Sequence, residues 1–284
     1  MHAHPAVALT GATGFLGRRL RDRLSSRGHQ VIAIGREAAP EIPDGAAVVH
    51  LAALMPTRAN AHDVDAHVAN TVQTASRLVA RIERASSVVL ASSIDVYGPL
   101  GALPADEAHP TEPDTVYGAC KLASEHLFRM ACRRAGIPLT TLRLSQVYGP
   151  GEPPVKAIPR FIAALQHGAS ITVANGGRDT RDFIYLDDAV AAIEAAIDRR
   201  AEGVFNIAGG REVAILQVAT TLARLHGAPE AVRVEPYAGS ASRGWFDISA
   251  ARRHLGYQPS VSIADGLARH YAAAHRPVSG PVHA

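Results

Sequence analysis

The sequence predicts an α/β fold, in which a doubly wound parallel sheet is joined to a smaller C-terminal α/β region. Short apolar runs alternate with segments of helical periodicity over the first half of the chain, a pattern typical of strands connected by crossover helices. This alternating pattern ends where prolines cluster at positions 150, 153, 154 and 159. We therefore expect residues 1–150 to form the sheet domain and residues 151–284 to form mainly the second region, with residues 183–205 returning to the sheet.

The individual elements follow from the periodicity of the apolar residues. Strands are expected at the short apolar runs Val7–Leu9, Val31–Ile34, Ala47–Leu51, Ser87–Leu90 and Leu139–Leu144. Helical periodicity follows the first run as far as Gly28, and it recurs at about Asp63–Arg84 and Val116–Ala135. In the C-terminal region, we expect helices near Ile158–His167 and Asp188–Arg199 and a short strand at Ile171–Val173.

The connection between the second and third strands is unusually short. A crossover between parallel strands needs a dozen or more residues, and a helix with an additional edge strand needs still more. This stretch also contains Pro40, Pro43 and Gly45, which disfavour regular structure. We therefore expect no regular helix and at most a two-residue strand between Arg36 and Ala47.

The composition excludes several classes of protein. The 284 residues contain 47% hydrophobic and 19% charged residues, which is ordinary for a globular enzyme, and no apolar run is long enough to span a membrane. The first residues lack the charged and apolar parts of a secretion signal, so we expect a cytoplasmic protein. The two cysteines lack metal-ligand spacing, and the net charge of +3 is small and scattered. We expect neither a metal site nor nucleic-acid binding.

A glycine-rich turn follows the first strand. Gly11, Gly14 and Gly17 stand between this strand and the first helix, where small residues allow the backbone to approach a pyrophosphate at the positive end of the helix dipole. The spacing is Gly-x-x-Gly-x-x-Gly, and a turn of this kind can also be purely structural. Together with the alternating elements, it predicts a Rossmann-type dinucleotide-binding sheet.

The end of the second strand bears on the choice of cofactor. A site that prefers NAD usually has an acidic residue here to bind the ribose hydroxyls, but this chain has Gly35 followed by Arg36. An arginine can hold a 2′-phosphate through two hydrogen bonds. We therefore expect NADP(H) to be preferred and NAD(H) to be possible, unless Arg36 is simply a solvated loop residue.

A second group of residues indicates acid–base chemistry. The fourth strand runs into Ser92 and Ser93, and Tyr117 and Lys121 stand four residues apart near the start of a predicted helix, so they share one face. A nearby ammonium stabilises a phenolate, and a serine hydroxyl can hold the substrate oxygen during hydride transfer. Lys121 and Lys156 are the only lysines among the 29 basic residues, and lysine and arginine are not interchangeable at a reactive site.

With these motifs, the sequence resembles the extended short-chain dehydrogenase/reductases, specifically the group of nucleotide-sugar epimerases, dehydratases and ketoreductases. The resemblance covers nearly the whole chain. Its motifs are the glycine turn, His50–Ala53, the helix with Asn70, Ser92–Ser93, Tyr117 with Lys121, Arg143–Gly151, Arg181–Asp188, Phe205–Gly210 and Leu255–Pro259.

The resemblance implies a role for individual residues. Ser93 would orient the substrate, Tyr117 would be the acid/base, and Lys121 would tune Tyr117 and bind the cofactor ribose. The other residues implied to bind the cofactor are Gly11, Thr13, Gly14, Phe15, Leu16, Gly17, Leu51, Ala52, Ala53 and Asn70. Arg181 would contact a substrate phosphate. The helices near 63–84 and 116–135 would pair with those of a second copy to form a homodimer.

The sequence also departs from the family pattern. The 4,6-dehydratases have an Asp-Glu pair after the catalytic hydroxyl, whereas this chain has Ile94 and Asp95, so dehydration lacks its proton donor. Gln146 replaces a substrate-facing asparagine, and Asp95 and Gln146 are expected to face the substrate. The C-terminal arginine that clamps the second phosphate has no clear counterpart, and Arg243 is a displaced candidate.

We therefore expect the NADP(H)-dependent reduction of a keto group, at carbon 4, of a nucleotide-activated deoxysugar. A nucleotide-sugar 4-epimerase that uses NAD is the first alternative, because it needs the same residues. A reductase of a carbonyl substrate without a nucleotide is the second, because of the missing arginine. A cofactor-binding regulatory or scaffold protein would not need Ser93, Tyr117 and Lys121 together.

Overall fold

A six-stranded parallel sheet forms the centre of the computed structural model, which describes residues 6–35 and 41–275. Its strands run in the order β10-β5-β4-β3-β1-β2, and every neighbouring pair is parallel. The strands are β1 (Val7–Thr10), β2 (Val31–Ile34), β3 (Ala47–His50), β4 (Ser87–Ser93), β5 (Leu139–Leu144) and β10 (Gly203–Ile207). The doubly wound α/β fold predicted from the sequence is confirmed.

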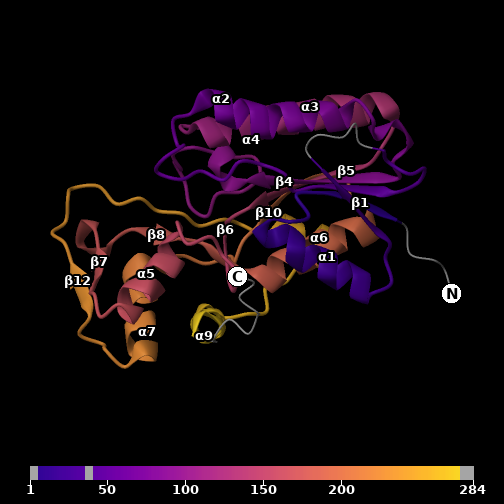
Figure 1. Ribbon diagram of the computed structural model, residues 1–284. Helices are drawn as coiled ribbons and strands as arrows, with labels where there is room; N and C mark the ends of the chain where they lie inside the picture. The colour runs from indigo at the N-terminus through magenta and orange to yellow at the C-terminus, as the bar shows by residue number, and fades with distance from the viewer. Residues whose placement is uncertain (1–5, 36–40, 276–284) are drawn as a thin grey trace.

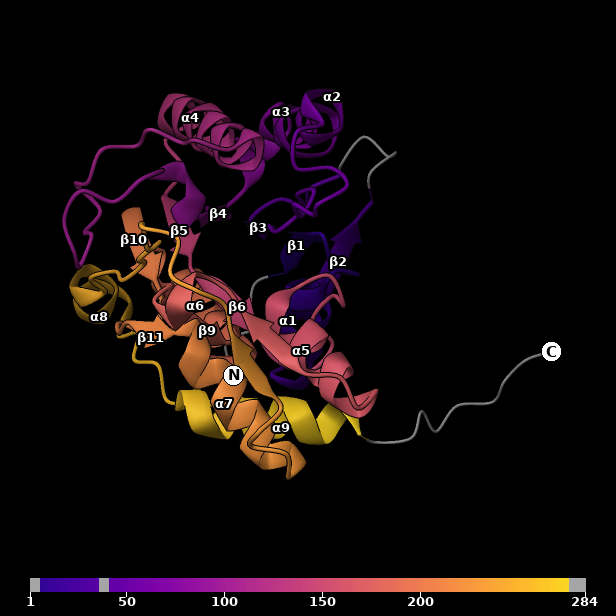
Figure 2. The same cartoon turned by 90° about the vertical axis from the view of Figure 1, so that its left-hand side faces the viewer.

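Helices cover both faces of this sheet, as Figures 1 and 2 show. One layer contains α2 (Val64–His67), α3 (Gln73–Val79) and α4 (Val116–Ala135), and the other contains α1 (Phe15–Ser26) and α6 (Leu186–Arg199). The four residues of β1 are buried on both faces, as expected for a strand inside a parallel sheet. The two helical layers therefore enclose a continuous apolar core on each side of the sheet.

The predicted helix 63–84 is interrupted. Asp63 caps α2 by accepting a hydrogen bond from the Ala66 amide at 2.9 Å, but a π-helical turn at Val68–Val72 follows before α3 begins. Within this turn, the side-chain amide of Asn70 donates to the Ala66 carbonyl at 2.8 Å. A single helix was therefore wrong, because the wider turn and a final 3-10 turn at Ile82–Arg84 break the 3.6-residue period.

The short connection after β2 leaves that strand at the edge of the sheet. Residues 36–40, including Arg36, lie outside the described part of the chain, so only the second half of the connection can be compared with the prediction. There, residues 41–46 contain neither helix nor strand. The described half thus agrees with a connection that runs to β3 without regular structure.

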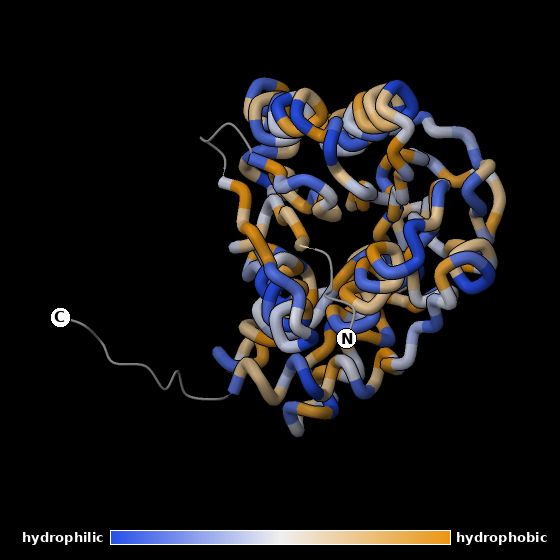
Figure 3. The backbone as a smooth tube through the Cα atoms, turned by 90° about the vertical axis from the view of Figure 1, so that its right-hand side faces the viewer, coloured by the Kyte–Doolittle hydropathy of each residue, from blue (hydrophilic) through white to orange (hydrophobic). Residues whose placement is uncertain are grey.

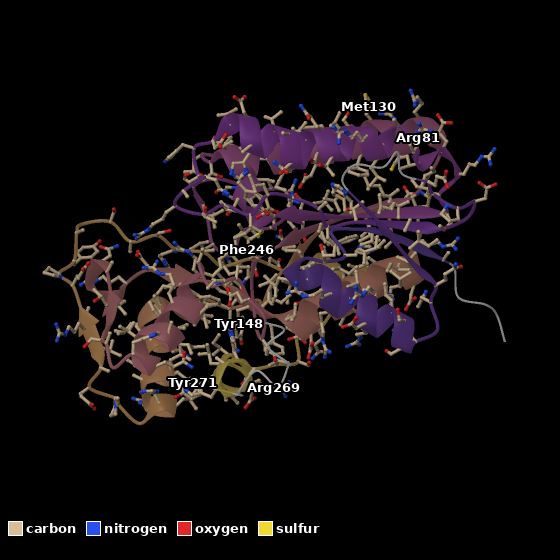
Figure 4. All side chains as sticks on the ribbon, viewed as in Figure 1. Arg81, Met130, Tyr148, Phe246, Arg269 and Tyr271 are labelled. Carbon is tan, nitrogen blue, oxygen red and sulfur yellow. The ribbon has the colours of Figure 1, made fainter. Side chains whose placement is uncertain are left out.

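The second lobe has its own apolar cluster below the sheet in Figure 1. Its helices are α5 (Ala157–Gln166), α7 (Ile215–His226) and α9 (Ile263–Ala274), and β7 (Ile171–Val173) pairs with β12 (Val232–Val234). Two short strand pairs connect this lobe to the sheet: β6 (Gln146–Tyr148) with β9 (Phe183–Tyr185), and β8 (Thr180–Arg181) with β11 (Val213–Ala214). The helix α8 (Ser249–Leu255) connects them as well. Tyr148 is buried where this lobe meets the sheet domain (Figure 4).

The distribution of hydropathy matches this layering. Figure 3 shows hydrophobic segments gathered in the interior, whereas the surface helices alternate between hydrophobic and hydrophilic residues. Among the described residues, no helix is both long and apolar enough to cross a membrane.

Candidate active site

A cavity of about 660 Å³ lies at the carboxyl ends of the central strands. Parallel α/β sheets bind their ligands at this edge, because the loops that follow the strands converge there. Residues of the β1–α1 turn, the ends of β2, β3 and β4, the start of α4 and the segment after β5 line it. The cavity therefore joins the sheet domain to the segment that leads into the second lobe.

The glycine turn forms a tight cradle at one side of the cavity. The Gly14 amide donates to the Gly11 carbonyl at 3.0 Å, and a Cβ atom on Gly17 would lie only 2.0 Å from the same oxygen. Gly11 has a φ of +71°, and a Cβ atom there would meet the Ala52 amide at 2.9 Å. No side chain caps α1, and its first turn has no acidic residue. These features fit a pyrophosphate, which would be stabilised by the uncapped amides and the helix dipole.

Most residues expected to bind the cofactor line this cavity. They are Gly11, Thr13, Gly14, Phe15, Leu16, Gly17, Leu51, Ala52, Ala53, Tyr117 and Lys121. Gly35 also lines it, but Arg36 lies outside the described residues. Asn70 is not among the lining residues, and the hydrogen bond that its side chain donates to the Ala66 carbonyl holds the π-helical turn together. The structure therefore does not bring Asn70 to the cavity.

Tyr117 and Ser93 come together because α4 packs closely on the turn that follows β4. Thr115 caps α4 by accepting from the Gly118 amide at 3.0 Å, and a Cβ atom on Gly118 would lie 2.3 Å from the Asp95 carbonyl oxygen. The absence of a side chain at Gly118 thus allows the contact. Burial and the Asp95 carboxylate raise the pKa of the Tyr117 phenol, and its hydrogen bond with Ser93 acts in the opposite direction.

Lys121 is buried beneath Tyr117, on the next turn of α4. Its ammonium donates to the Ala91 carbonyl, and burial lowers its pKa to about 8, although the Glu125 carboxylate opposes this shift. The resemblance implied that Lys121 lowers the pKa of Tyr117, but here the pKa of Tyr117 is raised. The physical reason is that burial and the Asp95 carboxylate act in the same direction, and the hydrogen bond with Ser93 does not offset them.

A buried polar network supports both catalytic elements from below. Glu125 of α4 accepts from the Ser92 hydroxyl at 2.5 Å and from the Arg143 guanidinium at 3.1 Å and 2.8 Å. These bonds connect α4 to β4 and β5, and they use the residue that precedes Ser93. His50 is also buried, bonded to the Thr10 hydroxyl at 2.8 Å, and burial lowers its pKa to about 3. His50 is therefore neutral and structural in this arrangement.

The residues expected to bind the substrate fall into two groups. Asp95 and Gln146 line the cavity, but Arg181 and Arg243 do not. The Arg181 guanidinium donates to the carbonyls of Thr180 and Ser242 at 2.6 Å and 3.2 Å. Arg243 forms two bonds of 2.6 Å with Glu212, which holds its charge away from the cavity.

Other lining residues were not expected from the sequence. Arg77 and Thr74 come from α3, and Met55 follows β3, whereas Glu152 and Lys156 lie in the segment before α5. The rarity of lysine was a signal for Lys156, but Arg77 had none, since it depends on how α3 packs. Among the described residues, no group of three or more His, Cys, Asp or Glu side chains could hold a metal ion.

The chain is similar to known nucleotide-sugar enzymes along most of its length. It is 30% identical over 308 residues to the UDP-glucose 4-epimerase of Mycolicibacterium smegmatis, covering 92% of this chain and 96% of that protein. It is 32% identical over 234 residues to a dTDP-glucose 4,6-dehydratase of Streptomyces griseus, covering 81% of this chain and 71% of that protein.

Solved structures give the same result. MoeE5 in complex with UDP-glucose and NAD has a TM-score of 0.84 and 28% identity, covering 95% of this chain and 98% of MoeE5. The UDP-glucuronic acid 4-epimerase of Bacillus cereus in complex with UDP-glucuronic acid and NAD has a TM-score of 0.84 and 27% identity, covering 94% and 98% of the two chains. The sequence model described as "NAD dependent epimerase/dehydratase family" matches residues 7–208. The chain therefore belongs to the NAD-dependent epimerase/dehydratase family of extended short-chain dehydrogenase/reductases, and it is an enzyme of that type.

Proposed function

We propose that the chain is an NAD-dependent 4-epimerase of a nucleotide diphosphate sugar. The observation that carries the proposal is that Ser93, Tyr117 and Lys121 line one cavity with the glycine cradle, so a cofactor and a sugar can meet there. Relatives that are 4-epimerases match this chain over more than nine tenths of its length. This proposal replaces NADP(H)-dependent reduction as the first choice.

The residues of the chain perform the proton transfers. The glycine cradle and Lys121 would hold the cofactor, which would supply the hydride acceptor and donor needed to invert the sugar carbon. Tyr117 takes the proton of the sugar hydroxyl during oxidation and gives it back during reduction, while Ser93 holds the oxygen. Because burial and Asp95 raise the pKa of Tyr117, the positive charge of Lys121 has to act on the phenol against both.

Dehydration fits the cavity poorly despite the similarity to a dehydratase. Loss of water needs a group that protonates the departing hydroxyl, and Ile94 stands where those enzymes have an acid. Ile94 is partly buried and packs against the apolar core. Of the two positions after Ser93, only Asp95 carries a carboxyl group, which suits binding of a hydroxyl more than elimination.

A reductase that uses NADPH is the second candidate. Its support is specific: Gly35 lines the cavity at the end of β2, so no carboxylate repels a 2′-phosphate at that position. Arg77 lines the same cavity. A reductase would exchange its cofactor in every cycle, whereas an epimerase returns the hydride and can keep it bound.

The experiment incubates the purified enzyme with UDP- and dTDP-linked sugars and with their 4-keto derivatives, each with NAD, NADH or NADPH. An epimerase yields a product of unchanged mass and inverted configuration at carbon 4. A gain of two hydrogens with consumption of NADPH identifies the reductase. Neither change, with every sugar and an enzyme that binds NAD, would refute the proposal, and Tyr117→Phe is the inactive control.

A further inference from the structure

The two lysines of the chain are brought to one cavity. Lys121 and Lys156 are 35 positions apart in a sequence whose other 27 basic residues are arginines, yet both line the 660 Å³ cavity. Lys121 is assigned to the cofactor and to Tyr117. Lys156 has no assignment, although its position in a ligand cavity makes it a candidate for binding an anion.

A nucleotide diphosphate sugar brings two negative phosphates into this cavity, and the expected arginines do not line it. Arg243 is paired with Glu212 through two bonds of 2.6 Å, and the Arg181 guanidinium donates to backbone carbonyls. Among the described cations, Arg77, Lys121 and Lys156 line the cavity. Arg77 stands on α3 in the sheet domain, whereas Lys156 stands in the segment after β5 that leads to α5 and also supplies Gln146 to the cavity.

The location of Lys156 suits this task. It precedes α5, and its amide donates to the Pro153 carbonyl at 3.1 Å, which holds the loop in a turn. Burial raises the pKa of Asp95 and of Glu152, and the positive charge of Lys156 opposes both shifts, so the ammonium is close enough to act on both carboxyl groups. Within the described ranges, however, no carboxylate lies within 4.0 Å of this ammonium, and its charge is not consumed by an ion pair.

We propose that the Lys156 ammonium binds the diphosphate of the sugar nucleotide, in place of the second arginine that this chain lacks. The inference rests on the proposed function. The cofactor pyrophosphate is a less suitable partner, because the glycine cradle and the amides of α1 already provide its site. A sugar carboxylate is also less suitable, since it would approach the acidic Asp95 beside Tyr117.

The test measures the dissociation constants of UDP, dTDP, UDP-glucose, UDP-glucuronate and NAD by calorimetry, without turnover. We expect Lys156→Met to lower the affinity for both nucleotide diphosphates and for both sugar nucleotides about tenfold, because one charge-assisted hydrogen bond is lost. NAD affinity should stay unchanged, and this also reports a folded protein. Lys156→Arg should restore most of the affinity. Arg160→Met is the matched control, since it removes one charge from the exposed face of the same helix.

Four results with the variants would overturn the inference. If Lys156→Met binds UDP and dTDP with wild-type affinity, the ammonium does not bind the diphosphate. The same conclusion follows if Arg243→Met lowers the affinity for these nucleotides and Lys156→Met does not. A loss confined to UDP-glucuronate would assign Lys156 to a sugar carboxylate, and a loss for NAD would assign it to the cofactor. If the wild-type enzyme binds NAD but none of the nucleotides, the proposed function itself fails and the inference fails with it.

Discussion

Replacing Glu152 by glutamine should change how stability depends on pH. The Glu152 carboxyl lies on the wall of the cavity, its side chain is 6% exposed, and its Oε2 atom has no hydrogen-bond partner among the described residues. The nearest titratable group is His270, whose Nδ1 atom lies 3.7 Å away and is also buried. Burial raises the pKa of Glu152 to about 8, although the charge of Lys156 acts against the shift.

The magnitude follows from this pKa. In the unfolded chain the carboxyl ionises near 4.5, so between pH 4.5 and about 8 the folded state binds more protons than the unfolded state. The contribution of Glu152 to stability is thus complete below pH 4.5 and is lost as the pH rises through 8. The full loss is on the order of 3–5 kcal/mol, and about 2 kcal/mol of it falls between pH 6.5 and 8.

His270 works in the opposite direction at lower pH. Burial lowers its pKa to about 4, so stability rises with pH between about 4 and 6.5 as the unfolded histidine loses its proton. Glu152→Gln also alters this effect, because His270 lies 3.7 Å from the carboxyl, but most of it falls below pH 6.5. The range from pH 6.5 to 8 therefore isolates Glu152.

The assay is urea unfolding of both proteins at pH 5.5, 6.5, 7.25 and 8. Glu152→Gln should gain stability relative to the wild type as the pH rises, by about 2 kcal/mol over the upper three points. Glu152→Asp, which keeps a carboxyl group, is the control and should retain the pH dependence. A difference between wild type and Glu152→Gln that is constant from pH 5.5 to 8 would refute the reasoning.

The remaining predictions concern catalysis, cofactor and assembly. Tyr117→Phe should abolish turnover and leave the dissociation constant of NAD nearly unchanged, because only the proton relay is lost; full activity would refute the mechanism. Arg36→Ala should weaken the binding of NADPH about tenfold and leave the binding of NADH nearly unchanged, since a guanidinium–phosphate pair is worth ~1.5–3 kcal/mol. Equal losses of affinity for both cofactors would assign Arg36 another role. A homodimer is expected through α3 and α4, where Met130 is 63% exposed on the outer face (Figure 4), so Met130→Glu should convert a dimer to a monomer in sedimentation. A monomeric wild type at micromolar concentration would contradict this.

The sequence predicts the sheet domain well because its signals are local. Buried parallel strands are nearly continuous apolar runs, and the expected strand Leu139–Leu144 and helix Val116–Ala135 have the same bounds in the structure. The π-helical turn at Val68–Val72 contains no proline or glycine that would mark it in the sequence, so the prediction of one helix passes over it. The short strands β8 and β11 depend on pairing across 30 residues, for which their two-residue lengths give no signal.

The candidate site also has a part that local sequence signals predict and a part that they do not. Ser93, Tyr117 and Lys121 stand on β4 and α4, and the Glu125 network fixes these elements to each other at distances of 2.5–3.1 Å. A motif on such rigid elements implies its own geometry, because sheet register and helical period leave few alternatives.

The substrate side depends instead on contacts between distant loops. Arg243 binds Glu212, 31 residues before it, and this pairing decides which cation remains available to a diphosphate. The spacing of residues along the sequence does not indicate whether a guanidinium binds a carboxylate of the protein or remains available to a ligand. Lys156 is different, because it stands out in the sequence as one of two lysines among 29 basic residues. Its place at the cavity, however, depends on the turn that begins at Pro153. Under the proposed function, we therefore expect substrate specificity to depend on which loop cations are already paired, so that changing a pairing acid such as Glu212 alters it without changing a catalytic residue.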